Sequence, residues 1–221
     1  MKIKGVNLMN WLINMLSSSI GKKLCMAVTG ICFCLFLAAH LAGNLTMLAG
    51  PDAFVRYAEK LHSLGFLLTA AETGLLVFAV IHVLTGAVLT YGNFISRPTR
   101  YQMKKGAGGR SIGSATMPYT GFLLLLFVIL HLLDFHFVDK TGRTIFQIVS
   151  TTFQQPVYVG LYIAAMVTAA LHVSHGLWSA FQTMGVNHPK YTPVIRLTSV
   201  LFSLAVGVGF GFLPVYLSLM R

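Results

Sequence analysis

The chain has 221 residues, of which 56% are hydrophobic and only 10% are charged, and its formal net charge is +11. Soluble domains carry about 25% charged residues, so this composition excludes an ordinary soluble domain and indicates a membrane protein. Nucleic acid is not an expected partner, because the basic residues fall in short connections between apolar segments.

Residues 1–20 form an N-terminal segment that we expect to lie at the cytoplasmic surface of the membrane. Its middle is too polar for the apolar core of a signal peptide. Trp11, several leucines and the flanking lysines suit a short helix at the membrane interface. A leader without regular structure is the alternative.

Five apolar segments follow, and each is long enough to cross a bilayer, for which about 20 residues are needed. Because lipid offers the backbone no hydrogen bonds, each segment is predicted to be an α-helix. Little chain remains between them, so we predict one membrane domain over 1–221, an all-α bundle of five transmembrane helices. The predicted helices span about 22–49, 65–92, 114–137, 156–183 and 194–218.

All three cysteines fall in the first predicted helix. Their odd number and their spacing give neither a disulfide framework nor a C-x-x-C-H haem attachment. We expect them to be packing residues, and any haem in this chain would be bound non-covalently. They are Cys25, Cys32 and Cys34.

The basic residues indicate the orientation of the bundle. Eleven of the sixteen Lys and Arg residues lie near the N-terminus and in the connections after the second and fourth helices. By the positive-inside rule, the N-terminus is predicted to be cytoplasmic and the C-terminus to lie outside. This basic face would attract anionic lipid headgroups, and it would equally suit the docking of a cytoplasmic protein.

Four histidines lie well inside four consecutive predicted helices: His40, His82, His131 and His172. An ionisable residue at membrane depth is a candidate functional residue. A single histidine could simply hydrogen bond to a neighbouring helix, but one in each of four helices favours a shared function. With a rise of about 1.5 Å per residue, the four fall into two layers. We name them the inner pair, His82 and His172, and the outer pair, His40 and His131.

Two imidazoles at one depth suit the two axial positions of a haem iron. An iron ligated in this way does not readily bind oxygen or a substrate, so it serves electron transfer. Two such haems at two depths would carry electrons across the membrane. A zinc or di-iron site fits less well, because its ligands would gather at one depth and usually include cysteines or carboxylates. His175 is a rival of His172, since residues three apart share a helix face.

Two segments carry a resemblance to a known family. The segments "SSIGKKLCMAVTG…FLAAHLAGNL" and "LHVSHGLWSAFQTMG" resemble the cytochrome b558 membrane-anchor subunits of succinate dehydrogenases and fumarate reductases, and the resemblance extends over nearly the whole chain. It implies a five-helix protein of the bacterial cytoplasmic (inner) membrane that holds two b haems. It also implies that the inner pair ligates the haem nearer the cytoplasm and that the outer pair ligates the other.

The resemblance further implies two protein partners, a flavoprotein subunit that interconverts succinate and fumarate and an iron–sulfur subunit that docks on the cytoplasmic face. The membrane substrate would be a quinone, commonly menaquinone, that reacts near the outer pair. The chain itself would carry electrons and perform no dicarboxylate chemistry. Quinone turnover takes up or releases two protons, so groups near the outer layer are candidates for a quinone site: Glu59 and His62, with Glu72 and Asp134 as others.

Two other functions remain open at this point. The di-haem cytochrome b of a formate dehydrogenase or hydrogenase also uses buried histidines, although its motifs are not evident in this sequence. A transporter or proton channel with a histidine relay would carry polar midplane residues and inverted repeats. The predicted helices offer few such polar residues besides the histidines. Haem content distinguishes the transporter from the cytochromes.

Overall fold

The computed structural model describes residues 8–96 and 112–220, and the described chain is helical. Five of its helices are long and apolar enough to cross a membrane, which confirms the prediction of an all-helical, multi-pass membrane protein. The basic connection over residues 97–111, on which the predicted orientation partly depends, lies outside the described residues. The five helices are α2 (Ser19–Leu45), α4 (Phe66–Ile95), α5 (Ile112–Phe135), α7 (Pro156–Thr183) and α8 (Thr192–Leu219).

The predicted helix ends agree with the structure to within a few residues, and those of α7 agree at both ends. The first helix is the clearest exception. It was predicted to reach residue 49, but α2 ends at Leu45 and a short 3-10 turn, η1 (Thr46–Ala49), follows. Gly50 then adopts a φ of 102°, a conformation that most residues avoid, and this reverses the chain before the next helix. At the N-terminus, α1 (Leu8–Ser17) precedes α2.

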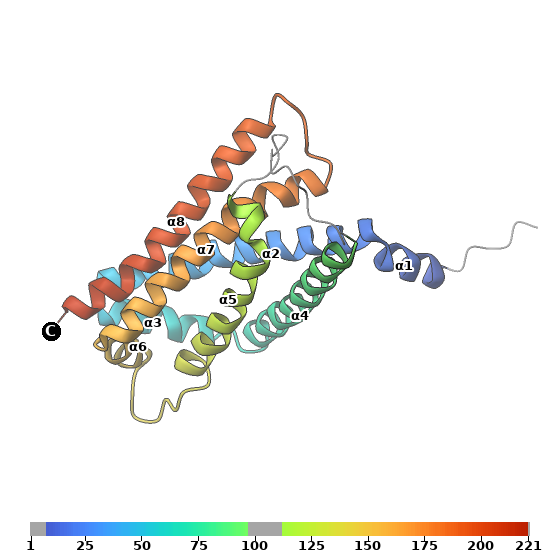
Figure 1. The fold of residues 1–221 in the computed structure, drawn as a ribbon. Helices are drawn as coiled ribbons and strands as arrows, with labels where there is room; N and C mark the ends of the chain where they lie inside the picture. Colours follow the sequence, from blue (N-terminus) through green and yellow to red (C-terminus); the bar gives the residue numbers. More distant parts are fainter. Residues whose placement is uncertain (1–7, 97–111, 221) are drawn as a thin grey trace, which may run out of the picture.

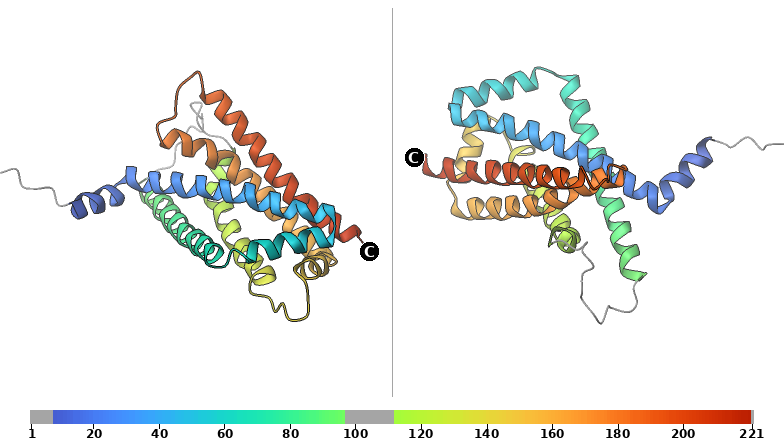
Figure 2. Two further views of the ribbon diagram at one scale, coloured as in Figure 1. Left: turned by 180° about the vertical axis from the view of Figure 1, so that it is seen from behind. Right: turned by 90° about the horizontal axis from the view of Figure 1, so that it is seen from above.

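Two short helices in the connections between the long ones were not predicted: α3 (Pro51–His62) and α6 (Ile145–Phe153). The start of α6 is fixed by a capping box, in which Oγ1 of Thr144 accepts from the backbone N–H of Gln147 and Oε1 of Gln147 accepts from that of Thr144. Both helices lie at the same end of the bundle, close to the C-terminus (Figures 1 and 2).

A hydrophobic core closes this end of the bundle. Phe54 of α3 and Val149 and Phe153 of α6 are buried against side chains from η1, α7 and α8. The amide of Gln154, which follows α6, donates hydrogen bonds to the carbonyls of Leu217 (3.1 Å) and Met220 (3.2 Å), and these bonds hold the end of α8 in place. The short helices therefore cover the end of the bundle at which the outer pair was predicted.

The long helices pack unequally. Helices α7 and α8 run alongside one another and α2 packs across them at an angle, whereas α4 contacts α2 and lies to one side (Figures 1 and 2). Along its whole described length α4 has no buried residue. The contact between α7 and α8 relies on small residues, since a Cβ added at Gly207 would lie 2.9 Å from Cβ of Ala170 and 3.4 Å from the carbonyl oxygen of Met166.

We predict that Gly207→Ala destabilises the bundle. The added methyl would meet Cβ of Ala170 and the carbonyl oxygen of Met166, which move only if α7 moves, and such overpacking costs about 1–3 kcal/mol. The thermal unfolding midpoint of the detergent-solubilised protein should fall. Gly74→Ala is the matched control, because a Cβ there would have nothing within 4 Å. Equal midpoints for the two variants would contradict the predicted packing.

Candidate functional site

The outer pair comes together between α2 and α5. The ring centroids of His40 and His131 are 5.9 Å apart, and the two ring planes are nearly perpendicular, at 87°. A metal–imidazole bond is about 2 Å long, so two imidazoles on opposite sides of one metal ion have centroids roughly 6 Å apart. The spacing of these two rings therefore fits two axial ligands of a single iron.

Aromatic side chains surround the outer pair. Phe36 stacks on His40 at 5.1 Å, and Phe135 meets the ring of His131 edge-on at 5.3 Å. Among the described residues, Nδ1 of His131 is buried without a hydrogen-bond partner. A buried polar nitrogen without a hydrogen-bond partner is uncommon in folded proteins. An imidazole that lacks such a partner and is surrounded by aromatic side chains is consistent with a position next to a bound prosthetic group.

The inner pair lies on the other two histidine-bearing helices, α4 and α7. Nδ1 of His82 in α4 lies 2.9 Å from Oγ1 of Thr29 in α2, and Nδ1 of His172 in α7 lies 3.0 Å from Oγ1 of Thr120 in α5. The two histidines that the spacing assigned to one layer therefore have matching environments, each beside a threonine of the preceding long helix.

The two pairs lie at different depths. Thr29, the partner of His82, precedes His40 by eleven residues in α2. Thr120, the partner of His172, precedes His131 by eleven residues in α5. Eleven residues of helix rise about 16 Å, so the pairs are stacked along the bundle at about that separation. A separation of this size is consistent with two prosthetic groups placed one above the other.

His175, the rival of His172, occupies a different environment. Its ring meets that of Trp178 edge-on at 5.1 Å, and the guanidinium of Arg196 lies 4.5 Å from the centroid of the same Trp178 ring. The start of α5 packs against it, since a Cβ added at Gly113 would lie 2.6 Å from Cβ of His175. These contacts favour His172 as the member of the inner pair.

Of the four candidates for a quinone site, three are exposed. Glu59 and His62 lie on the surface of α3, where the Nδ1 atom of His62 is 2.7 Å from the carbonyl oxygen of Ala58, and Glu72 is exposed on α4. Asp134 is different, because its carboxylate accepts a hydrogen bond of 2.8 Å from the hydroxyl of Tyr162, which is only 5% exposed. The ring of Tyr162 also lies 6.1 Å from that of His131.

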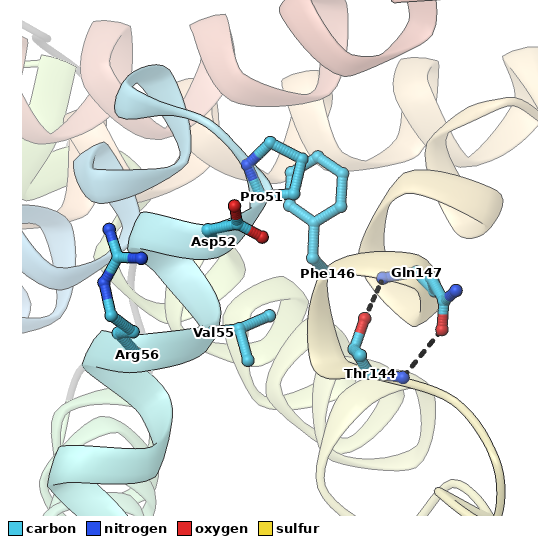
Figure 3. A pocket seen from close by; sticks show the side chains of 7 residues that line it. All are labelled: Pro51, Asp52, Val55, Arg56, Thr144, Phe146 and Gln147. Carbon is cyan, nitrogen blue, oxygen red and sulfur yellow. Dashed lines mark hydrogen bonds between the residues drawn. The ribbon is translucent and has the colours of Figure 1, made fainter.

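Two cavities lie near α6. The larger, of about 510 Å³, lies between α3 and the start of α6 (Figure 3). The smaller, of about 260 Å³, is lined by Asp134 and Arg143 together with residues of α6 and the start of α7. Arg143 is held in a structured loop, because its guanidinium donates to the carbonyl of Asp139 at 2.9 Å. The backbone N–H of Thr141 donates a hydrogen bond to the Asp139 carboxylate, and this bond lowers the pKa of Asp139.

The side chains of this chain that could ligate a metal come in pairs and not in larger clusters. Among residues 8–96 and 112–220, no three His, Cys, Asp or Glu side chains gather into a cluster that would hold a bare metal ion. Haem supplies four of the iron ligands from its own macrocycle and needs at most two more from the protein. The two histidine pairs fit that requirement.

Sequence reasoning missed three polar residues beside the histidines: Thr29, Thr120 and Tyr162. A signal for the first two is present, because "MAVTG" and "MPYTG" place Thr and Gly at the same distance before His40 and His131. No comparable pattern marks Tyr162. Its contact with Asp134 joins two helices and depends on how α5 and α7 pack.

Comparison with known proteins gives one informative relative. No protein-family model matches the chain, and no solved structure matches it at a significant level. The chain is similar to a protein of Bacillus subtilis (strain 168) named succinate dehydrogenase cytochrome b558 subunit. The two are 25% identical over 179 residues, which cover 80% of this chain and 84% of the relative. This similarity confirms the resemblance to the cytochrome b558 subunits of succinate dehydrogenase that the sequence motifs carry.

Proposed function

We propose that this chain is the di-haem membrane anchor of a succinate dehydrogenase or fumarate reductase complex. It transfers electrons between a membrane quinone and an iron–sulfur subunit. The observation that carries the proposal is the pairing of four histidines, one from each of α2, α4, α5 and α7, in two layers along the bundle. The similarity to a succinate dehydrogenase cytochrome b558 subunit supports it independently.

Two haem b groups are the proposed cofactors, one to be held by His82 and His172 and one by His40 and His131. Haem supplies one-electron transfer when it is bound. With two histidines as iron ligands, each haem would have no open position for oxygen or other small ligands. The aromatic wall around the outer pair, formed by Phe36, Phe127, Phe135 and Phe210, excludes water from that site.

Menaquinone, or another quinone, is the proposed membrane substrate, and it reacts near the outer pair. Glu59 and His62 remain predicted members of the quinone site. The contacts of Asp134 favour the smaller cavity more strongly, because Tyr162 bridges the Asp134 carboxylate and the His131 ring. In that cavity Asp134 would exchange protons with the quinone, and Arg143 would bind one of its oxygen atoms.

The proposed partners are the flavoprotein and iron–sulfur subunits of the same complex. They would dock on the face that carries most of the Lys and Arg residues, at the end of the bundle nearer the inner pair. The positive-inside rule makes that face cytoplasmic and places the N-terminus there, with the C-terminus outside. In a bacterium the membrane would be the cytoplasmic membrane.

The first experiment is a dithionite-reduced minus oxidised visible spectrum of the purified protein, with haem quantified per chain. We expect about two b-type haems per chain, because the four histidines would supply two protein ligands to each of two haems. Absence of haem from a folded, membrane-inserted sample would overturn the proposal and favour the transporter. Catalytic partners that oxidise formate or hydrogen, if they co-purified with the haem protein, would favour the other di-haem cytochromes.

A further inference from the structure

The bundle contains a repeated unit. The pattern M-x-x-T-G, with a His ten residues after the Gly, occurs in α2, as Met26, Thr29, Gly30 and His40, and again in α5. The second copy begins 91 residues after the first. Each copy is followed by a short helix and then by a long helix that carries an inner-pair histidine with a glycine four residues after it. In α5 the pattern comprises Met117, Thr120, Gly121 and His131.

The contacts of the unit repeat as well as its sequence. Thr29 bonds to His82, and Gly30 lies against the same ring, since a Cβ there would be in van der Waals contact with Cε1 of His82 at 3.6 Å. In the second unit Thr120 bonds to His172, and a Cβ at Gly121 would lie 3.4 Å from its Cε1. The methionines follow the same rule, with Met26 facing Gly86 and Met117 facing Gly176. Two independent copies of one arrangement make a chance contact a poor explanation.

The hydrogen atom of each threonine hydroxyl is already committed. Oγ1 of Thr29 donates to the carbonyl of Cys25 at 2.7 Å, and Oγ1 of Thr120 donates to the carbonyl of Thr116 at 3.0 Å. A hydroxyl has one hydrogen and two lone pairs, so toward the histidine each oxygen acts as an acceptor. The ring must then donate from Nδ1, which places its single hydrogen there. Nε2 is left with a free lone pair.

We propose that Thr29 and Thr120 are positioning residues for the inner haem, an inference that rests on the proposed function. Each accepts the Nδ1–H of one inner-pair histidine, fixes its tautomer and ring orientation, and leaves Nε2 as the iron ligand. The threonines are 4% and 6% exposed, so water does not compete for these bonds. The outer pair lacks this arrangement at His131, whose Nδ1 has no partner among the described residues.

A consequence for electron transfer follows from the hydrogen bond. An imidazole that donates from its second nitrogen is a more basic ligand. A more basic ligand stabilises the oxidised iron and lowers the reduction potential. The threonines are thus expected to lower the potential of the inner haem and not that of the outer haem.

The test is a redox titration of the haems in the assembled complex carrying Thr29→Val or Thr120→Val. Valine keeps the shape and removes the hydroxyl. We expect the midpoint potential of the inner haem to rise by an amount equivalent to roughly a tenfold change in its reduced-to-oxidised ratio, about 59 mV for one electron. Its electron paramagnetic resonance signal should shift, and the outer haem in the same sample should keep its potential and its signal.

Three further variants complete the design. Thr73→Val is the matched control, because Thr73 donates to a carbonyl of its own helix at 2.8 Å but is exposed on α4. Thr29→Ser and Thr120→Ser keep the hydroxyl and should retain the wild-type potential. If the valine variants lose the inner haem, retention of that haem in the serine variants supports the proposal, and its loss there overturns it. An unchanged inner haem in both valine variants also overturns it and leaves the proposed function intact, whereas a wild type without haem refutes the proposed function itself.

Discussion

Replacing His82 by alanine is expected to reduce the haem content from two to about one per chain, because the proposed inner haem would lose one of its two protein ligands. The three cysteines offer no C-x-x-C-H attachment that would retain it covalently. His172→Ala should remove the same haem, and His40→Ala and His131→Ala should each remove the other. The measurement is haem per chain, combined with a redox titration that identifies which haem remains.

The pattern of loss tests the pairing as well as the ligands. The haem that remains in each variant shows that the bundle is still folded around its second site, so loss of one haem is separated from general misfolding. His136→Ala and His188→Ala are suitable controls, since both side chains are exposed near the ends of helices or in a loop. Two haems retained in His82→Ala, or His175→Ala behaving like His82→Ala, would contradict the proposed inner pair.

The long helices and the pairing of the histidines could be predicted from the sequence for a simple physical reason. A bilayer sets the length of each apolar segment and forces it to be helical, so position along the sequence translates into depth. Depth alone then pairs His82 with His172 and His40 with His131. The short helix α6 could not be found by this rule, because its apolar residues are buried in protein and its start is fixed by a local cap at Thr144.

Polar contacts between helices could not be predicted from the sequence. Depth along one helix does not give its rotation, and a hydrogen bond between two helices depends on both rotations. Thr29 could have been noticed through the repeated pattern, since eleven residues are about three turns and place it on the same face of α2 as His40. Glu59 and His62 were predicted for the quinone site because they lie near the outer layer, before the second long helix. In the structure, α3 holds both on its exposed surface.

Asp134→Asn is expected to lower the rate of quinone turnover by about 10²–10⁴-fold, the usual contribution of a positioned acid–base group. Asparagine keeps the shape and the hydrogen bond from Tyr162 but cannot exchange a proton. The measurement is electron transfer between succinate or fumarate and a menaquinone analogue in the assembled complex. Electron transfer from succinate to a soluble dye at the catalytic subunits should be unchanged, and both haems should keep their spectra.

Three further variants decide between the two locations for the quinone. Tyr162→Phe removes the only side-chain hydrogen bond that the described structure gives to Asp134, so it should lower the rate by a smaller factor than Asp134→Asn. Asp139→Asn is the matched control, because this carboxylate is exposed and bonds within its own loop. If Glu59→Gln abolishes turnover while Asp134→Asn does not, the quinone reacts beside α3. The Asp134–Tyr162 contact then only joins α5 to α7, and the smaller cavity has no part in proton exchange.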